Sequence, residues 1–145
     1  MATVEQLLCV KGHAVHTIST TATVFEAIAK MVANNVGSLV VFNDSGPSGM
    51  ITERDYLRRI ALEGRSSKTT FVQEIMSPGL IYVDPQTDVE QCMSLMTHRR
   101  IRHLPVLDAG RLIGLVSIGD IVRHLARERE TTIEELTFYI QGRYA

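Results

Sequence analysis

Apolar residues recur at two different spacings in the first half of the chain. The helical spacing i, i+3, i+4, i+7, i+8 is followed by Val24, Ala27, Ile28, Met31 and Val32. We expect Gly37 to end that helix. Residues 39–42 are all apolar, which is typical of a buried strand, and a polar turn at 43–47 separates them from a strand at 49–51. With a short strand at 16–18 and a helix at 54–62, the pattern predicts a β-α-β-β-α unit. The apolar face of the second helix is predicted to hold Tyr56, Leu57, Ile60 and Ala61.

The second half of the chain repeats this order of elements. The pattern predicts a strand at 81–83, a hairpin of strands at 104–107 and 112–116 turned at 108–110, and a final helix that contains 121–126. The helix between them is lined by Val89, Cys92, Met93 and Met96. Pro105 has no backbone N–H, so we expect an edge strand or a missing ladder bond there.

The two halves are copies of one unit. The sequence Gly-Met-Ile-Thr-Glu-Arg-Asp at 49–55 matches Gly-Leu-Val-Ser-Ile-Gly-Asp at 114–120, at an offset of 114 − 49 = 65. The offset holds without a gap from His16/Ile81 to Ile60/Leu125. An internal repeat fixes the architecture, so we predict one compact α/β body in which two units share one core.

The segments outside the copies are also informative. Residues 4–8 resemble 72–76 at an offset of 72 − 4 = 68, so the loop before the first copy is three residues longer. The linker at 63–70 is polar, which predicts flexibility. A capping box at 131–134 predicts a separate short helix with Ile133, Leu136 and Ile140. We therefore divide the chain into a first unit at 1–64, a second at 65–128 and a helical extension at 129–145.

Composition excludes several function classes. The net charge is −1, 45% of the 145 residues are hydrophobic and 21% are charged, as in ordinary globular proteins. This net charge does not favour nucleic acid binding, and no apolar stretch is long enough to span a membrane. The first five residues do not resemble a signal peptide. Cys9 and Cys92 form no motif, so we expect reduced thiols and a cytoplasmic location.

The repeated hydroxyl-x-x-Asp sequence has two interpretations. In the first, Thr52 and Ser117 are helix N-caps, and Asp55 and Asp120 interact favourably with the helix dipole. In the second, the helix N-terminus attracts a phosphate, and each carboxylate accepts hydrogen bonds from the cis-diol of a ribose. Both interpretations can hold at once.

Other chemistries are weakly supported. The five histidines have no metal-ligand spacing, so we expect no metal. The basic run 98–103 lacks the aromatic residues that stack on bases. No nucleophile elbow or glycine-rich dinucleotide fingerprint is present, so we expect no enzyme and no catalytic cofactor. Cys92 is predicted to be a buried thiol. A structural or oligomerisation module remains the alternative to a binding module.

The two glycine-to-aspartate motifs, together with Arg102-His103-Leu104-Pro105-Val106-Leu107 and Val72-Gln73-Glu74-Ile75-Met76-Ser77, resemble a tandem pair of cystathionine-β-synthase (CBS) domains. The resemblance runs from Val4 to about Glu128 and is closest to stand-alone two-domain members. It implies an α/β (α+β) fold with pseudo-twofold symmetry, usually dimeric. It also implies a regulatory module that binds AMP, ADP, ATP or NAD(H), less often S-adenosylmethionine, and acts on an unknown partner protein.

The resemblance implies two ligand clefts, each bounded by both units. One would contain His16, Thr17, Ile18, Val36, Gly37, His103, Ser117, Gly119 and Asp120. The other would contain Thr52, Arg54, Asp55, Ser77, Leu80, Ile81, Tyr82, Ile101 and Arg102. Because Arg54 in one motif matches Gly119 in the other, we expect the Arg54 cleft to prefer ligands with more phosphate and the Gly119 cleft to prefer AMP.

Overall fold

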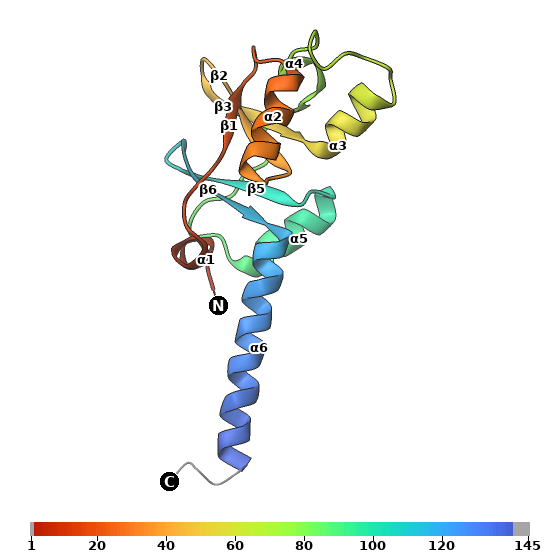
Figure 1. Ribbon diagram of the computed structural model, residues 1–145. Coiled ribbons are helices and arrows are strands. Elements are labelled where there is room, and N and C mark those ends of the chain that lie inside the picture. The colour runs from red at the N-terminus through yellow and green to blue at the C-terminus, as the bar shows by residue number, and fades with distance from the viewer. Residues whose placement is uncertain (1, 141–145) are drawn as a thin grey trace.

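The computed structural model describes residues 2–140, and it contains both repeated units (Figure 1). The first unit consists of β1 (Thr17–Ser19), α2 (Val24–Asn34), β2 (Ser38–Asn43), β3 (Gly46–Thr52), α3 (Glu53–Tyr56) and the π-helix η1 (Leu57–Ala61). The second consists of α5 (Val89–Arg99), β5 (His103–Asp108), β6 (Arg111–Ser117) and α6 (Ile118–Ile140). Before the units lie α1 (Val4–Lys11) and, between them, α4 (Val72–Ile75) and β4 (Ser77–Pro78).

The helices begin largely as the sequence predicts, but they end differently. Thr23 caps α2 by accepting a hydrogen bond from Glu26 N. Asn35, in the left-handed conformation at φ 53°, ends the helix two residues before Gly37, so Gly37 is not the terminator. The predicted helix at 54–62 is a short α-turn followed by a π-helix. Val32, Leu57 and Met93, assigned to apolar faces, are 76%, 56% and 38% exposed. Ala61 is also exposed.

The two sheets differ in size although their hairpins match. The first has the order β1-β2-β3-β4, whereas the second contains only β5 and β6. Each hairpin has a register irregularity at the same place, between Val41 and Phe42 in one and between Val106 and Leu107 in the other. The repeat therefore preserves even the local distortion of the ladder.

Pro105 explains why the predicted strand at 81–83 is absent. In the first unit, β1 pairs in parallel with β2, and Val40 N donates a hydrogen bond to the His16 carbonyl oxygen. The position that matches Val40 is Pro105, which has no N–H to donate. Only Val83 remains paired, through a single bridge to Val106. The missing ladder bond expected at Pro105 is thus confirmed, while the strand itself was wrongly predicted.

The short helices α1 and α4 are exchanged between the units, because each packs on the unit other than the one it precedes. Val4 N donates to the Thr87 carbonyl and Val89 N donates to the Ala2 carbonyl, which joins α1 to the start of α5. The matching bonds in the other half are Val72 N to the Ala22 carbonyl and Val24 N to the Thr70 carbonyl, and they join α4 to α2. The N-terminal helix therefore belongs structurally with the second repeat.

The buried residues form two hydrophobic clusters, which corrects the prediction of one shared core. One cluster combines α1 with the second unit, including Leu7, Leu8, Cys92 and Val116. The other combines α4 with the first unit. Each cluster combines residues of one sheet, of that unit's own helices and of the exchanged short helix, so each unit has a core of its own.

The linker and the C-terminal helix also differ from expectation. The linker is tied to the first turn of α2, because the Ser67 and Thr70 carbonyls accept bonds from Phe25 N and Val24 N.

The helix α6 continues through 131–134 without interruption and extends away from the rest of the molecule (Figure 1). No proline occurs in it, and threonine lowers helix propensity only slightly. The capping box therefore does not start a new helix. The side chains of Ile133, Leu136 and Ile140 lie outside the described part.

Candidate functional site

The junction between β6 and α6 holds the second aspartate of the repeat. Ser117 N donates to Asp120 Oδ2 at 2.8 Å, and Asp120 N donates to Ser117 Oγ at 3.1 Å. These reciprocal bonds form an N-terminal capping arrangement. The Asp120 side chain is only 7% exposed, so its carboxylate requires partners within the protein.

The junction between β3 and α3 has the same arrangement. Thr52 N donates to Asp55 Oδ2 at 2.9 Å, Thr52 Oγ1 lies 3.2 Å from the same oxygen, and Asp55 N donates to Thr52 Oγ1 at 3.3 Å. Within residues 2–140, Asp55 Oδ1 has no hydrogen-bond or ion-pair partner. The capping interpretation is confirmed at both junctions, and at Asp55 it leaves one carboxylate oxygen unused.

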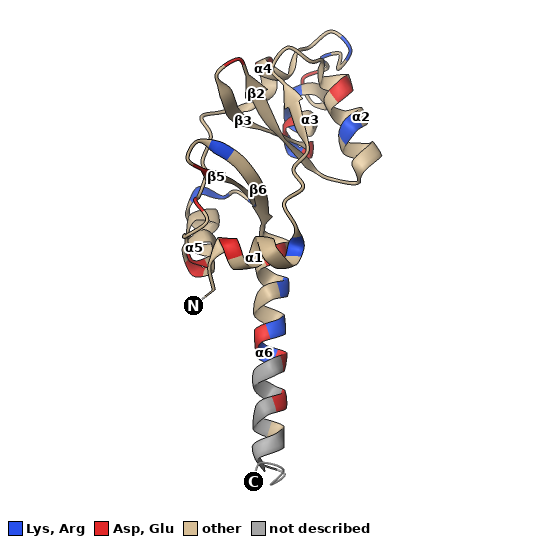
Figure 2. Ribbon diagram, turned by 90° about the vertical axis from the view of Figure 1, so that its left-hand side faces the viewer, with Lys and Arg blue, Asp and Glu red and all other residues tan. Residues whose placement is uncertain are grey.

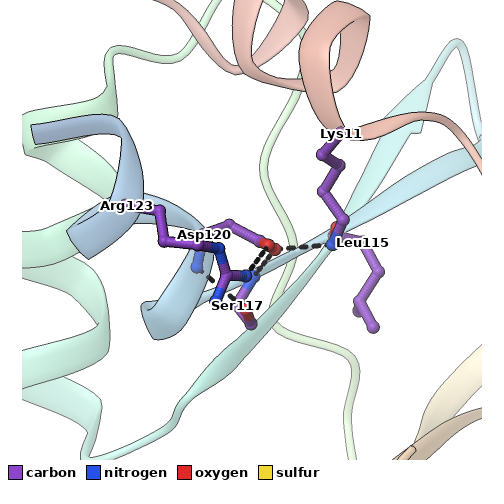
Figure 3. A network of polar contacts seen from close by, with 5 residues as sticks. All are labelled: Lys11, Leu115, Ser117, Asp120 and Arg123. Carbon is purple, nitrogen blue, oxygen red and sulfur yellow. Dashed lines mark hydrogen bonds and ion pairs between the residues drawn. The ribbon is translucent and has the colours of Figure 1, made fainter. Parts of the chain in front are cut away.

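Two cations surround Asp120 that sequence reasoning had not assigned to the site. Lys11 Nζ lies 2.5 Å from Asp120 Oδ2 and donates to the Leu115 carbonyl oxygen at 2.6 Å. Arg123 Nη2 lies 2.8 Å from Asp120 Oδ1. Figure 3 shows the lysine reaching the carboxylate from α1 and the arginine reaching it from α6. Asp120 is thus bonded through both oxygens.

Only one of these contacts had a sequence signal. Asp120 and Arg123 are spaced i, i+3 on a helix, where opposite charges meet. Lys11 is separated from Asp120 by 109 positions, and no local pattern connects them. Lys11 reaches the site because α1 packs on the second unit and has eight residues, whereas the matching α4 has four. Figure 2 shows α1 beside the start of α6.

Asp55 and Arg58 match Asp120 and Arg123 in the repeat, but they do not form the corresponding ion pair in the described structure. The space occupied by the Arg123 guanidinium adjoins Gly119, whose added Cβ would lie 3.4 Å from Arg123 Nη1. Arg54 stands at the position that matches Gly119, and its side chain and charge oppose a similar placement of Arg58.

The electrostatics of the Asp120 site follow from these neighbours. Burial by itself raises the pKa of Asp120, but the hydrogen bonds from Lys11 and from the Ser117 backbone outweigh it and lower the pKa below its ordinary value. The pKa of His103 is also lowered, first by burial and then by the positive charge of Lys11. At neutral pH the site therefore contains an ionised aspartate, two cations and a neutral histidine.

The other predicted site residues make no direct polar contact with either aspartate in the described structure, and Ile81 and Tyr82 are not in the strand expected for them. The Gly37 carbonyl accepts a bond from Glu53 N, and the Arg102 carbonyl accepts the matching bond from Ile118 N. Ser77 pairs with Met50 at the end of β3. Strand β1 contains Thr17 and Ile18, and Val36 lies two residues before β2. The irregular segment before Val83 contains Leu80, Ile81 and Tyr82. Ile101 packs against the hydrophobic cluster of the second unit, and Arg54 is exposed.

The two motif glycines have a packing role. A Cβ on Gly49 would collide with the Ser77 carbonyl oxygen of β4, and one on Gly114 would lie 2.7 Å from Leu8 Cδ2 of α1. Gly49 therefore lets β4 approach the first sheet, and Gly114 lets α1 approach the second. This is the close backbone approach that a strand glycine permits, and it accounts for both glycines without a ligand.

The cavity beside α1 lies away from the predicted site residues. A cavity of about 400 Å³ lies between α1, residues 84–86 and the β5–β6 turn, and none of the predicted site residues lines it. Within the described chain, no group of three or more His, Cys, Asp or Glu side chains could hold a metal ion. Likewise, no described helix is long and apolar enough to cross a membrane.

Comparisons with known proteins identify the family. The CBS domain family matches the chain twice, at residues 10–62 and 72–127. The mitochondrial CBS domain-containing protein CBSX3 of Arabidopsis thaliana is 47% identical over 131 residues, which are 87% of this chain and 64% of that protein. The chain therefore spans less than two thirds of that relative.

Solved structures agree with this assignment. The crystal structure of the CBS domain protein NE2398 is 46% identical, with a TM-score of 0.82 over 86% of this chain and 98% of that one. The hexameric CBS-CP12 protein from bloom-forming cyanobacteria is 31% identical, with a TM-score of 0.76 over 84% of this chain and 70% of that one. The fold is a pair of CBS units, as the resemblance implied. The chain belongs to the CBS domain family, which is a family of regulatory modules.

Proposed function

We propose that this CBS pair is a sensor module that binds adenosine-containing ligands in two clefts, one at each aspartate. The observation that carries the proposal is the repeated strand-to-helix junction with a carboxylate three residues after a hydroxyl. Such a junction offers backbone N–H groups to a phosphate and carboxylate oxygens to a ribose diol. AMP, ADP, ATP and NAD(H) fit this chemistry, and S-adenosylmethionine, which lacks a phosphate, fits it less well.

The two aspartates differ in how many of their carboxylate oxygens already accept hydrogen bonds from the protein. Asp55 uses one carboxylate oxygen for capping, so its second oxygen is available for a ribose hydroxyl. Asp120 has donors on both oxygens. The Asp55 cleft is therefore the better candidate for a ligand in the structure as it stands, and Arg54 beside it favours a ligand with several phosphate groups. Regulation would follow from ligand-dependent changes in the packing of the two units or in assembly.

Titration calorimetry with AMP, ATP and NAD tests this proposal. Loss of a charge-assisted bond of roughly 1.5–3 kcal/mol predicts that Asp55→Ala weakens its cleft by at least about tenfold. Asp44→Ala removes the same group from an exposed turn and serves as the control. Unchanged binding in the Asp55→Ala, Asp120→Ala double variant would rule out both clefts. Mass spectrometry of small molecules released by denaturation would identify the natural ligand.

A homodimer is the proposed assembly. Val122 on α6 is 56% exposed and Leu125 is 37% exposed, and a twofold mate would cover such apolar side chains. The hexameric CBS-CP12 relative shows that a related chain assembles. Light scattering should give about twice the chain mass of 16.1 kDa at micromolar concentration. A monomer with and without nucleotide would contradict the proposal.

The ion pairs of Asp120 favour a second candidate function for the second unit. A carboxylate with three donors from Lys11, Ser117 and Arg123 can act purely as a structural ion-pair centre. In that case only the Asp55 cleft binds ligand, and Asp120→Ala changes stability without changing ligand affinity or stoichiometry. The same calorimetric series distinguishes the two possibilities.

A further inference from the structure

Lys11 occupies the carboxylate oxygen that a ligand in the Asp120 cleft would need. An ionised carboxylate accepts about four hydrogen bonds. Three donors already surround Asp120, and the Lys11 ammonium is within 2.5 Å of Oδ2. A ribose diol that binds both oxygens must displace at least one of them.

Of the two cations, Lys11 is the one whose displacement affects another part of the fold. Arg123 is 66% exposed and lies on the same helix as Asp120, so solvent can take over its hydrogen bonds. Lys11 is 28% exposed and is the last residue of α1. Its ammonium also bonds the Leu115 carbonyl, so it joins α1 to both β6 and α6.

The first unit shows what the site is like without this lysine. There β4 lies alongside β3, and Ser77 pairs with Met50, the residue that matches Leu115. A strand therefore pairs with this sheet edge in the first unit, whereas in the second unit the Lys11 ammonium bonds the Leu115 carbonyl. Asp55 has no cation bound to it in the described chain. Lys11 is thus an asymmetric addition, made possible by the longer α1.

We propose that Lys11 is an intramolecular competitor for the ligand of the Asp120 cleft, so that nucleotide binding and the Lys11–Asp120 ion pair exclude each other. This inference rests on the proposed function and goes beyond it by naming the element that responds. Ligand binding at Asp120 releases the C-terminal end of α1 from β6. A partner that holds α1 in place would lower the ligand affinity of this cleft. By linkage, the ligand would lower the affinity for that partner by the same factor.

The test is titration calorimetry with AMP on the full chain carrying Asp55→Ala, which isolates the Asp120 cleft. Lys11→Met and Lys11→Gln should bind AMP about tenfold more tightly than the Asp55→Ala parent, because the ligand no longer has to displace the ammonium; tenfold corresponds to about 1.4 kcal/mol. Lys68→Met removes the same charge from the linker and should bind AMP like the parent. Tighter binding despite the loss of a positive charge cannot come from long-range attraction to phosphate.

A second measurement follows α1 itself. In protein with Lys11 intact, AMP should accelerate amide hydrogen exchange in the last turn of α1, whereas Lys11→Met should exchange rapidly with or without AMP. Unchanged or weaker AMP binding in both Lys11 variants would overturn the competitor role, and weaker binding would make Lys11 a phosphate contact. Binding to the Asp55 cleft is measured separately in Asp120→Ala. If AMP binds there but the Lys11 variants show no gain, only this inference fails. If AMP binds neither cleft in any variant, the proposed function fails with it.

Discussion

Leu8 of α1 packs against Gly114 of β6, so closely that a Cβ on the glycine would lie 2.7 Å from Leu8 Cδ2 and 2.9 Å from Leu8 Cδ1. Leu8 is fully buried, which leaves its side chain little room to move. This contact joins the N-terminal helix to the second unit, and it lies one residue before Leu115, whose carbonyl binds Lys11.

Gly114→Ala should therefore destabilise the protein by about 1–3 kcal/mol, the usual cost of overpacking a buried site. Gly37→Ala is the matched control, because its Cβ would lie 3.4 Å from the exposed Glu53 carboxylate and should cost less than about 0.5 kcal/mol. Urea unfolding followed by circular dichroism measures both. Adding Leu8→Ala to Gly114→Ala should cost less than the sum of the single changes. Strict additivity would contradict the contact.

The capping hydroxyls support a separate prediction. Thr52→Ala and Ser117→Ala each remove an acceptor for an aspartate N–H and should lower the free energy of unfolding by about 0.5–2 kcal/mol. Thr52→Ser and Ser117→Thr keep the oxygen and should retain most of the stability. The measurement is made without nucleotide, so that a loss shows capping and not ligand binding. Equal stability of the alanine and hydroxyl variants would contradict the capping role.

The ion pair between Lys11 and Asp120 should depend on pH in a defined direction. The pKa of Asp120 is lowered in the folded protein from its ordinary value of 3.8, so its stabilising contribution is complete above that value. The contribution is lost as the pH falls through the lowered pKa, because the carboxyl becomes protonated. A double-mutant cycle with Lys11→Met and Asp120→Asn should give a coupling energy of about 0.5–3 kcal/mol at pH 7. The coupling should fall towards zero in acid. A coupling energy that does not vary with pH would show that packing, and not charge, links the two residues.

The two cysteines should react very differently. Burial, followed by the charge of Asp88, raises the pKa of Cys92 to about 11, whereas Cys9 is exposed on α1. Because the thiolate is the reactive form, a disulfide reagent at pH 8 should label one thiol in the native protein and two after unfolding in urea. Cys9→Ser identifies the reactive position, since native labelling should then disappear. Rapid labelling of Cys92 in the native protein would contradict its burial in the hydrophobic cluster of the second unit.

Much of each unit was predictable because local chemistry fixes it. The helical spacing from Val24 to Met31, the apolar run at 39–42 and the two hydroxyl-x-x-Asp junctions all depend on residues close together in the chain. The loss of a ladder bond at Pro105 was predictable for the same reason, since the missing N–H is a property of one residue. The strand at 81–83 was wrongly predicted because pairing depends on the partner strand as well as on the apolar pattern.

The sequence by itself determined the repeat, the family and the two capped junctions. Only the tertiary structure decided that α1 packs on the second unit, that each unit has its own core, and that Lys11 reaches Asp120. These features depend on contacts between residues far apart in the chain, and the periodicity of one segment does not specify which remote segment will cover it. The asymmetry of the two aspartates therefore arises from packing, because an additional turn of α1 places an ammonium where the other unit has a strand.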